Sequence, residues 1–159
     1  KAYCTRVGMG PFPTELLDKT GTELRDAGNE YGSTTGRPRR CGWLDLVALK
    51  YATMLDGVTE LIMMKADVLD KFDSIKICVG YEIDGEVSGH FPFELNDDVK
   101  PVYVELPGWK TDLTQIKDQN EFPEELNNYI NFIEEEMGIP VSIASVGPNR
   151  EQTIFLEKE

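Results

Sequence analysis

The chain has 159 residues, 40% hydrophobic and 28% charged, a composition typical of one globular domain and too apolar for a disordered segment. Its net charge of −13 repels phosphate backbones, so no nucleic-acid partner is expected, although a local basic site could still hold a small anion. No apolar run reaches the roughly 20 residues that span a bilayer, so no membrane partner is expected, and three widely spaced cysteines favour a reducing cytoplasm.

In chain order, the apolar periodicity and the positions of Gly and Pro predict alternating strands and helices. The predicted elements are a strand over 1–7, a helix over 21–27 with a Thr20/Glu23 capping box, a polar loop over 29–42, a helix over 43–56, a strand over 58–64, a hairpin of 75–83 and 86–88 turning at Asp84-Gly85, a strand over 102–106, a helix over 124–137, and strands over 141–145 and 153–156.

This alternation predicts an α/β domain, with a mainly parallel sheet flanked by helices and a β-hairpin insertion. In such sheets, ligands bind beyond the carboxyl ends of the strands. The candidate site residues are therefore those that follow predicted strands, namely Val7, Lys65-Ala66-Asp67 and Ser145-Val146-Gly147-Pro148.

The tripeptide Lys65-Ala66-Asp67 has the residue types of a guanine-reading site. A carboxylate after a buried strand would accept hydrogen bonds from the ring N–H and the exocyclic amino group of guanine, a donor pair that adenine lacks on that edge. The apolar stem of Lys65 would lie against the purine while its ammonium stays in water. Taken alone, the tripeptide more often represents a solvated lysine followed by a helix-capping aspartate.

The segment Ser145-Val146-Gly147-Pro148 could form the opposite wall of a purine site. Its Ser and Gly expose backbone N–H groups just past a strand, and Pro148 offers a flat apolar face. The alternative is an ordinary β-turn, which is the more frequent outcome for such a sequence on its own.

Three arginines are concentrated in the segment Ser33-Thr34-Thr35-Gly36-Arg37-Pro38-Arg39-Arg40 of this acidic chain. A guanidinium group is a planar fork that fits carboxylate and phosphate, and the neighbouring hydroxyls and loop N–H groups would complete a carboxylate site. The alternative is a solvated basic loop that pairs with the acidic surface. Because three fixed charges beside a glycine need a compensating anion, the segment favours a ligand site.

The longer segments that contain these residues resemble the adenylosuccinate synthetase family, in order over the whole chain. The matching segments are Thr5–Glu15, Gly28–Asp45, Lys65–Asp70 and Ser145–Arg150, together with Pro107-Gly108-Trp109 and residues 126–130. The TTGRxRR run followed by GWLD is highly specific, and Pro38 falls at its variable position.

The resemblance is to the C-terminal portion of the family, which implies that residues 1–159 form a single C-terminal segment of a larger P-loop-like ligase fold. The Gly-rich phosphate loop, the catalytic aspartate, the catalytic histidine and the Mg2+ site are expected on the N-terminal half, which this sequence lacks. The resemblance thus implies no catalytic residue and no metal ligand on this segment, which is expected to be inactive alone.

Carried over residue by residue, the resemblance assigns binding roles to both groups of candidates. Val7 resembles a position that contacts IMP, and the loop from Ser33 through Thr34, Thr35 and Gly36 to Arg39 resembles one that closes on L-aspartate. Arg37 resembles an arginine shared between IMP and the aspartate carboxylate, and Arg39 one that reaches the GTP phosphates. The implied guanine contacts are Lys65, Ala66 and Asp67, faced by Ser145, Val146, Gly147 and Pro148.

The implied reaction joins IMP and L-aspartate to give adenylosuccinate, GDP and phosphate, a step of purine biosynthesis in a cytoplasmic homodimer. Phosphorylation of the IMP 6-oxygen makes a leaving group, which the amine of aspartate displaces. Two alternatives remain open from the residues: a free-standing guanine-nucleotide-binding domain, which should contain its own phosphate loop, and a structural α/β domain without a nucleotide.

Overall fold

The computed structural model describes residues 1–157, which divide into two compact units. Unit 1 comprises residues 1–2, 53–75 and 106–157, and unit 2 comprises residues 3–52 and 76–105. The candidate guanine-binding residues all belong to unit 1, whereas Val7 and the arginine segment belong to unit 2.

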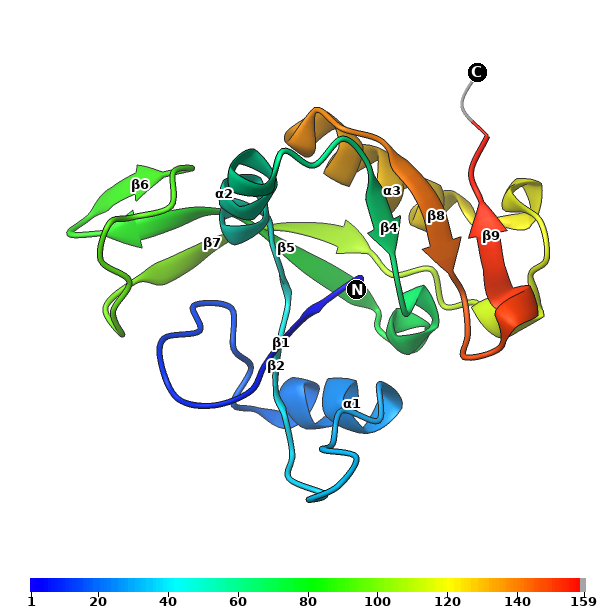
Figure 1. Cartoon of the computed structure of the whole chain (residues 1–159), viewed down its shortest axis with the longest axis horizontal. Helices are drawn as coiled ribbons and strands as arrows, with labels where there is room; N and C mark the ends of the chain where they lie inside the picture. The colour runs from blue at the N-terminus through cyan, green and yellow to red at the C-terminus, as the bar shows by residue number, and fades with distance from the viewer. Residues whose placement is uncertain (158–159) are drawn as a thin grey trace. The chain divides into compact units, whose positions relative to one another are not determined.

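Unit 1 is built on a three-stranded sheet in the order β4-β8-β9 (Figure 1). β4 (Leu61–Met63) pairs in parallel with β8 (Val141–Ser145), and β9 (Thr153–Phe155) pairs with β8 antiparallel. The helix α3 (Glu124–Met137) buries an apolar stripe, and Gly138 ends it in the left-handed conformation with φ 68°. The stripe consists of Leu126, Tyr129, Ile130 and Ile133.

Four short 3-10 helices connect the regular elements of unit 1. They are η1 (Ala66–Leu69), η2 (Leu113–Gln115), η3 (Gln119–Glu121) and η4 (Arg150–Gln152). Asp112 and Asp118 cap η2 and η3 by accepting hydrogen bonds from backbone N–H groups of Thr114 and Asn120. Of these turns, η1 follows β4 and packs against β8 and η2.

Unit 2 contains an antiparallel pair and a second sheet. β1 (Cys4–Arg6) pairs with β2 (Arg40–Gly42), and the helix α1 (Lys19–Ala27) packs against β2. In the second sheet, β5 (Ser74–Ile83, of which residues 76–83 belong to this unit) pairs in parallel with β3 (Leu44–Asp45), antiparallel with β6 (Glu86–Ser88), and also with β7 (Lys100–Pro107, of which residues 100–105 belong to this unit). Val47, Cys78, Tyr81 and Val99 form its buried core.

The α/β class and the β-hairpin through Asp84-Gly85 are confirmed, and the helix over 124–137 has the predicted bounds. The strand pairings are more mixed than expected, since parallel and antiparallel pairs both occur in the described sheets. The cap of α1 was predicted wrongly: Asp18, not Thr20, accepts the hydrogen bond from Gly21 N.

Two other boundaries differ for a local reason. The predicted helix over 43–56 begins at Leu46 in α2 (Leu46–Asp56), because Leu44 and Asp45 pair with β5 and the Asp45 carboxylate accepts the hydrogen bond from Ala48 N at 3.1 Å. The predicted polar loop over 29–42 ends in β2 rather than in loop, since Cys41 and its neighbours pair with β1.

Candidate functional site

The first group of candidates surrounds the turn that leaves β4. Lys65 adopts the left-handed conformation (φ 63°) immediately before η1, an uncommon backbone state for a residue with a side chain. Such strained positions are concentrated at functional sites. The turn buries Ala66 and places Asp67 in the first turn of η1.

The carboxyl group of Asp67 is only partly satisfied. Its Oδ1 atom is buried and has no hydrogen-bond partner among the described residues. Burial raises the pKa of Asp67, an effect that its own backbone N–H and Lys65 oppose and that Asp112 reinforces. A buried acceptor without a donor costs about 1–3 kcal/mol, so a ligand that brings N–H groups to this oxygen would remove an existing penalty.

The second candidate segment lies next to the first, because β8 packs against η1. Ser145 and Val146 are buried at the end of β8, and the Ser145 hydroxyl donates to Gly147 O at 3.0 Å. A Cβ atom on Gly147 would lie 2.3–2.7 Å from the amide group of Gln152, so only glycine fits there without displacing that side chain. The structure thus brings together the two predicted walls of the purine site.

Sequence reasoning missed Asp70, which connects η1 to the turn containing Trp109. The Asp70 carboxylate accepts hydrogen bonds from Trp109 Nε1 at 2.8 Å and from Leu113 N at 3.0 Å. Burial raises the pKa of Asp70 to about 6. The signal was present in the sequence, because a Trp expected in a packed turn needs an acceptor for its indole N–H.

In unit 2, the arginine segment forms a small closed loop. Gly32 N donates to Arg37 O and Gly36 N to Gly32 O, both at 2.8 Å, and Tyr31 forms an isolated β-bridge with Pro38. Gly36 occupies the left-handed region at φ 64°. Ser33, Thr34, Thr35 and Arg37 are exposed on this loop, and within residues 1–157 the Arg37 guanidinium takes part in no hydrogen bond or ion pair.

The other two arginines of the segment, Arg39 and Arg40, pair with carboxylates of unit 2. Arg39 Nη1 lies 2.8 Å from Oε2 of Glu30, whose side chain is 0% exposed, and Tyr3 OH donates to the other carboxylate oxygen at 2.5 Å. Arg40 makes a bidentate pair with Glu15 and donates to Gly8 O and Gly10 O. The positive charges of Arg39 and Arg40 are therefore balanced within the protein.

Arg40 was also missed as a functional candidate. Its hydrogen bonds to two carbonyl groups shape the Gly8–Gly10 loop that follows Val7, and the pair with Glu15 raises the pKa of Arg40. Val7 itself is 80% exposed, so its side chain is available to a ligand rather than buried in unit 2. Arg40 is thus the structural arginine of the segment, and Arg37 the exposed one.

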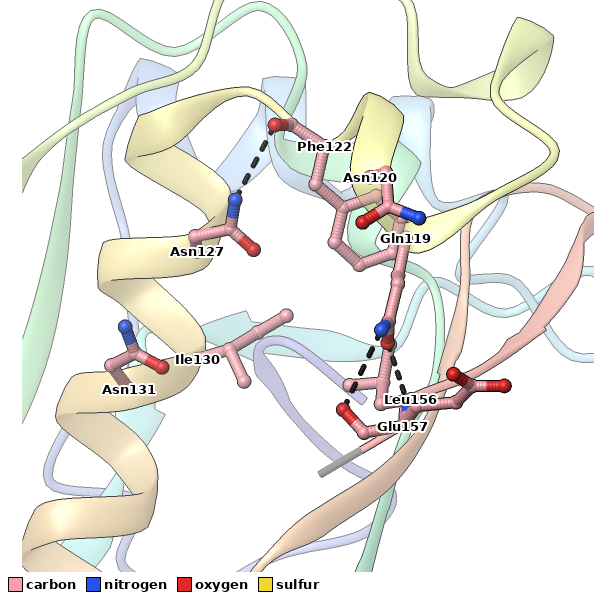
Figure 2. Close-up of a pocket in the computed structure, with 8 residues that line it drawn as sticks. All are labelled: Gln119, Asn120, Phe122, Asn127, Ile130, Asn131, Leu156 and Glu157. Atoms are coloured by element: carbon pink, nitrogen blue, oxygen red, sulfur yellow. Dashed lines mark hydrogen bonds between the residues drawn. The ribbon is translucent and has the colours of Figure 1, made fainter. Parts of the chain in front are cut away.

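A separate pocket of about 430 Å³ lies between η3, α3 and the residues after β9 in unit 1 (Figure 2). Amide side chains line it, with Asn127 Nδ2 donating to Phe122 O at 3.3 Å and Glu157 N donating to Gln119 Oε1 at 2.7 Å. None of the predicted site residues lines this pocket. Its lining contains Glu157 but no basic residue, which disfavours a nucleotide phosphate.

The longest and most apolar helices within residues 1–157 fall short of what a membrane crossing requires. Over the same residues, no three or more His, Cys, Asp or Glu side chains gather in a way that could hold a metal ion.

Comparison with known proteins gives one consistent family. The adenylosuccinate synthetase family model matches residues 1–154. The adenylosuccinate synthetases of Parabacteroides distasonis and Bacteroides fragilis are both 62% identical, over 97% and 98% of this chain. A solved structure of fully ligated adenylosuccinate synthetase from Plasmodium falciparum is 40% identical and superposes with a TM-score of 0.93 over 98% of this chain.

The coverage of those proteins is much lower: this chain spans 36% and 37% of the two bacterial relatives and 38% of the Plasmodium chain. The match thus accounts for nearly all of the present sequence and for little more than a third of each relative. On the family match and these identities, the chain belongs to the adenylosuccinate synthetase family.

Proposed function

We propose that residues 1–159 are a C-terminal segment of a GTP-dependent ligase that joins IMP and L-aspartate to give adenylosuccinate, GDP and phosphate. In this proposal, unit 1 supplies the guanine site and unit 2 supplies contacts to IMP, L-aspartate and the GTP phosphates. The family membership of the chain supports the reaction.

The observation that carries the proposal is the buried, unpartnered Oδ1 atom of Asp67. Guanine offers a ring N–H and an amino N–H on one edge, and a carboxylate accepts both. The Lys65 stem and the Ala66 backbone lie on the same turn, and the Ser145–Pro148 segment follows the strand that packs on that turn. The site therefore contains an acceptor that guanine satisfies and adenine does not.

The arginine loop is proposed to hold the reacting groups. Arg37 is exposed, and its guanidinium takes part in no hydrogen bond or ion pair within residues 1–157, so this planar fork is free to bind the carboxylate of L-aspartate and IMP. Arg39 is anchored on Glu30 yet remains 35% exposed, which suits an arginine that stabilises phosphoryl charge during GTP consumption. The hydroxyls of Ser33, Thr34 and Thr35 and the backbone of Gly36 would close on L-aspartate, and Val7 would contact IMP.

The remaining machinery is proposed to lie outside this segment. The phosphate loop, the catalytic aspartate and histidine and the Mg2+ ligands would belong to the N-terminal half of the enzyme, a cytoplasmic homodimer. Mg2+ would neutralise charge on the GTP phosphates when bound. The present residues would position base, aspartate and IMP, and positioning alone does not transfer a phosphoryl group.

The proposal is tested by steady-state kinetics of the full-length enzyme that contains this chain. Asp67→Ala should raise the KM for GTP at least tenfold and leave the KM for L-aspartate unchanged, because a hydrogen bond to a charged group contributes about 1.5–3 kcal/mol. Arg37→Ala should raise the KM for L-aspartate and leave the KM for GTP unchanged. Asp73→Ala, at a carboxylate 87% exposed in the same unit, is the control.

If each of the variants Asp67→Ala and Arg37→Ala weakened the binding of both GTP and L-aspartate, the proposed division of roles between the two units would be contradicted. It would also be contradicted if neither variant weakened the binding of either substrate. Failure of the wild-type enzyme to form adenylosuccinate from IMP, L-aspartate and GTP would refute the proposed reaction itself.

A further inference from the structure

The two walls of the proposed guanine site are connected to each other through a third segment, η2 with its flanking residues. One wall is the Lys65–Asp67 turn, and the other is the Ser145–Pro148 segment. A side chain from the neighbourhood of each wall is hydrogen-bonded to the backbone of Leu113–Thr114: Asp70 on one side and Gln152 on the other.

Asp70 attaches the first wall. It directly follows η1, which contains Asp67, and its backbone N–H bonds back to Asp67 O at 3.2 Å. Its carboxylate accepts hydrogen bonds from Leu113 N and Trp109 Nε1, and Trp109 is 3% exposed. The buried indole and the backbone of Leu113 thus fix the position of η1.

Gln152 attaches the second wall. Its Nε2 donates to Thr114 O at 2.8 Å, its Oε1 accepts from Asn149 N at 2.8 Å, and its backbone carbonyl accepts from Val146 N at 2.9 Å. Its amide also lies against Gly147, where an added Cβ would come within 2.3 Å of Oε1. One side chain therefore spans from the Ser145–Pro148 segment to η2.

These contacts form a continuous chain from Asp67 through Asp70, Leu113–Thr114 and Gln152 to Gly147. We propose that Asp70 and Gln152 are positioning residues for nucleotide specificity, which set the separation of the two guanine-binding walls by fastening both to the same backbone segment. This inference rests on the proposed function. Neither side chain needs to touch the nucleotide, because each acts through the wall that it holds.

The physical reason is the steep distance and angle dependence of hydrogen bonds. Asp67 recognises guanine only if its two oxygens face two N–H groups while the opposite segment holds the base. A wall that shifts by about 1 Å loses that alignment even though every contacting residue is still present. Inosine lacks the 2-amino group, so the preference for GTP over ITP reports how well Asp67 is aligned.

The experiment compares GTP and ITP as substrates of the full-length enzyme. The test variants are Asp70→Asn, which replaces one acceptor oxygen with a donor, and Gln152→Glu, which keeps the acceptor for Asn149 N but removes the donor to Thr114 O. The exposed neighbours supply matched controls, Asp73→Asn and Glu151→Gln. Thermal unfolding of every variant checks that the enzyme is folded.

We expect each test variant to reduce the ratio of kcat/KM for GTP to that for ITP by about three- to tenfold, mainly through the KM for GTP, because one held hydrogen bond is lost or weakened. The KM values for IMP and L-aspartate should not change, and the controls should match the wild type. Merely structural residues would lower activity with both nucleotides equally and leave the ratio unchanged.

The failure of this inference is distinguishable from failure of the proposed function. If Asp67→Ala abolishes the preference for GTP while Asp70→Asn and Gln152→Glu retain the wild-type ratio, the inference is wrong and the guanine site stands. If Asp67→Ala itself leaves the ratio unchanged, the proposed guanine site is wrong. Should Asp70→Asn fail to fold, Gln152→Glu decides the question by the same ratio, and Trp109→Phe, which removes the indole donor to Asp70 together with part of a buried ring, is a second variant read out in the same way.

Discussion

The anchoring of Arg39 on a buried carboxylate leads to a quantitative prediction for Glu30→Gln. Glu30 is 0% exposed, and its two oxygens accept from Tyr3 OH and from Arg39 Nη1. Glutamine retains one acceptor for Tyr3 but presents an N–H2 group to the guanidinium, so two donors face each other. The charge-assisted hydrogen bond to Arg39 is lost, while the volume of the side chain is unchanged.

The magnitude follows from the exposure of the two partners. A hydrogen bond to a charged group contributes about 1.5–3 kcal/mol. Because the Arg39 side chain is 35% exposed, water compensates part of the loss, and we expect about 2 kcal/mol. This lowers the free energy of local opening, which corresponds to about 30-fold faster amide exchange in residues 30–41.

Hydrogen exchange monitored by mass spectrometry measures this directly in the enzyme, with peptides that cover residues 28–42. Glu23→Gln is the matched control, since Glu23 pairs with Lys19 on the exposed surface of α1 and should leave the exchange unchanged. Release of Arg39 should also lower kcat, with a smaller effect on the KM for GTP. Wild-type exchange in Glu30→Gln would refute the claim that the buried carboxylate holds this arginine.

Three further results are expected. Gly147→Ala should raise the KM for GTP several-fold, because its Cβ would displace the amide of Gln152, and kinetics at saturating IMP and L-aspartate measure this. GTP affinity should weaken as the pH falls through about 6, because burial raises the pKa of Asp70 to that value and its protonation weakens the hydrogen bonds accepted from Trp109 Nε1 and Leu113 N; in Asp70→Asn this pH dependence should be smaller in a binding titration at varied pH. The 159-residue chain alone should form no adenylosuccinate, and product formed by a contaminant-free sample would contradict this.

Much of the fold was predictable because local signals agreed with the tertiary structure. The apolar stripe of α3 and the glycine at position 138 were enough to predict both ends of that helix, and Asp84-Gly85 was enough to predict the hairpin. Local patterns could not show that Leu44 and Asp45 pair with β5, since the partner strand lies more than thirty residues away. Asp18 was overlooked as the cap because Thr20 and Glu23 offered a competing pattern.

The candidate site likewise contains residues that local sequence patterns predict and residues that only the tertiary structure reveals. Residue types and their position after strands were enough to predict Asp67 and the Ser145–Pro148 segment as candidate guanine contacts, because the chemistry of guanine recognition is local. Asp70 and Gln152 act through partners that are 43 and 38 positions away, and no spacing rule connects them. Arg40 could not be separated from Arg37 by sequence, because only the fold determines which guanidinium meets Glu15.

The central claim is that the carboxylate of Asp67 reads guanine, and calorimetric binding of GDP and ADP to the full-length enzyme and its Asp67→Ala variant tests it most directly. The wild type should prefer GDP. The variant should bind GDP at least tenfold more weakly and ADP with unchanged affinity, since adenine lacks the donors that the carboxylate accepts. Equal affinity of the wild type for both nucleotides, or an unchanged GDP isotherm in the variant, would contradict the account.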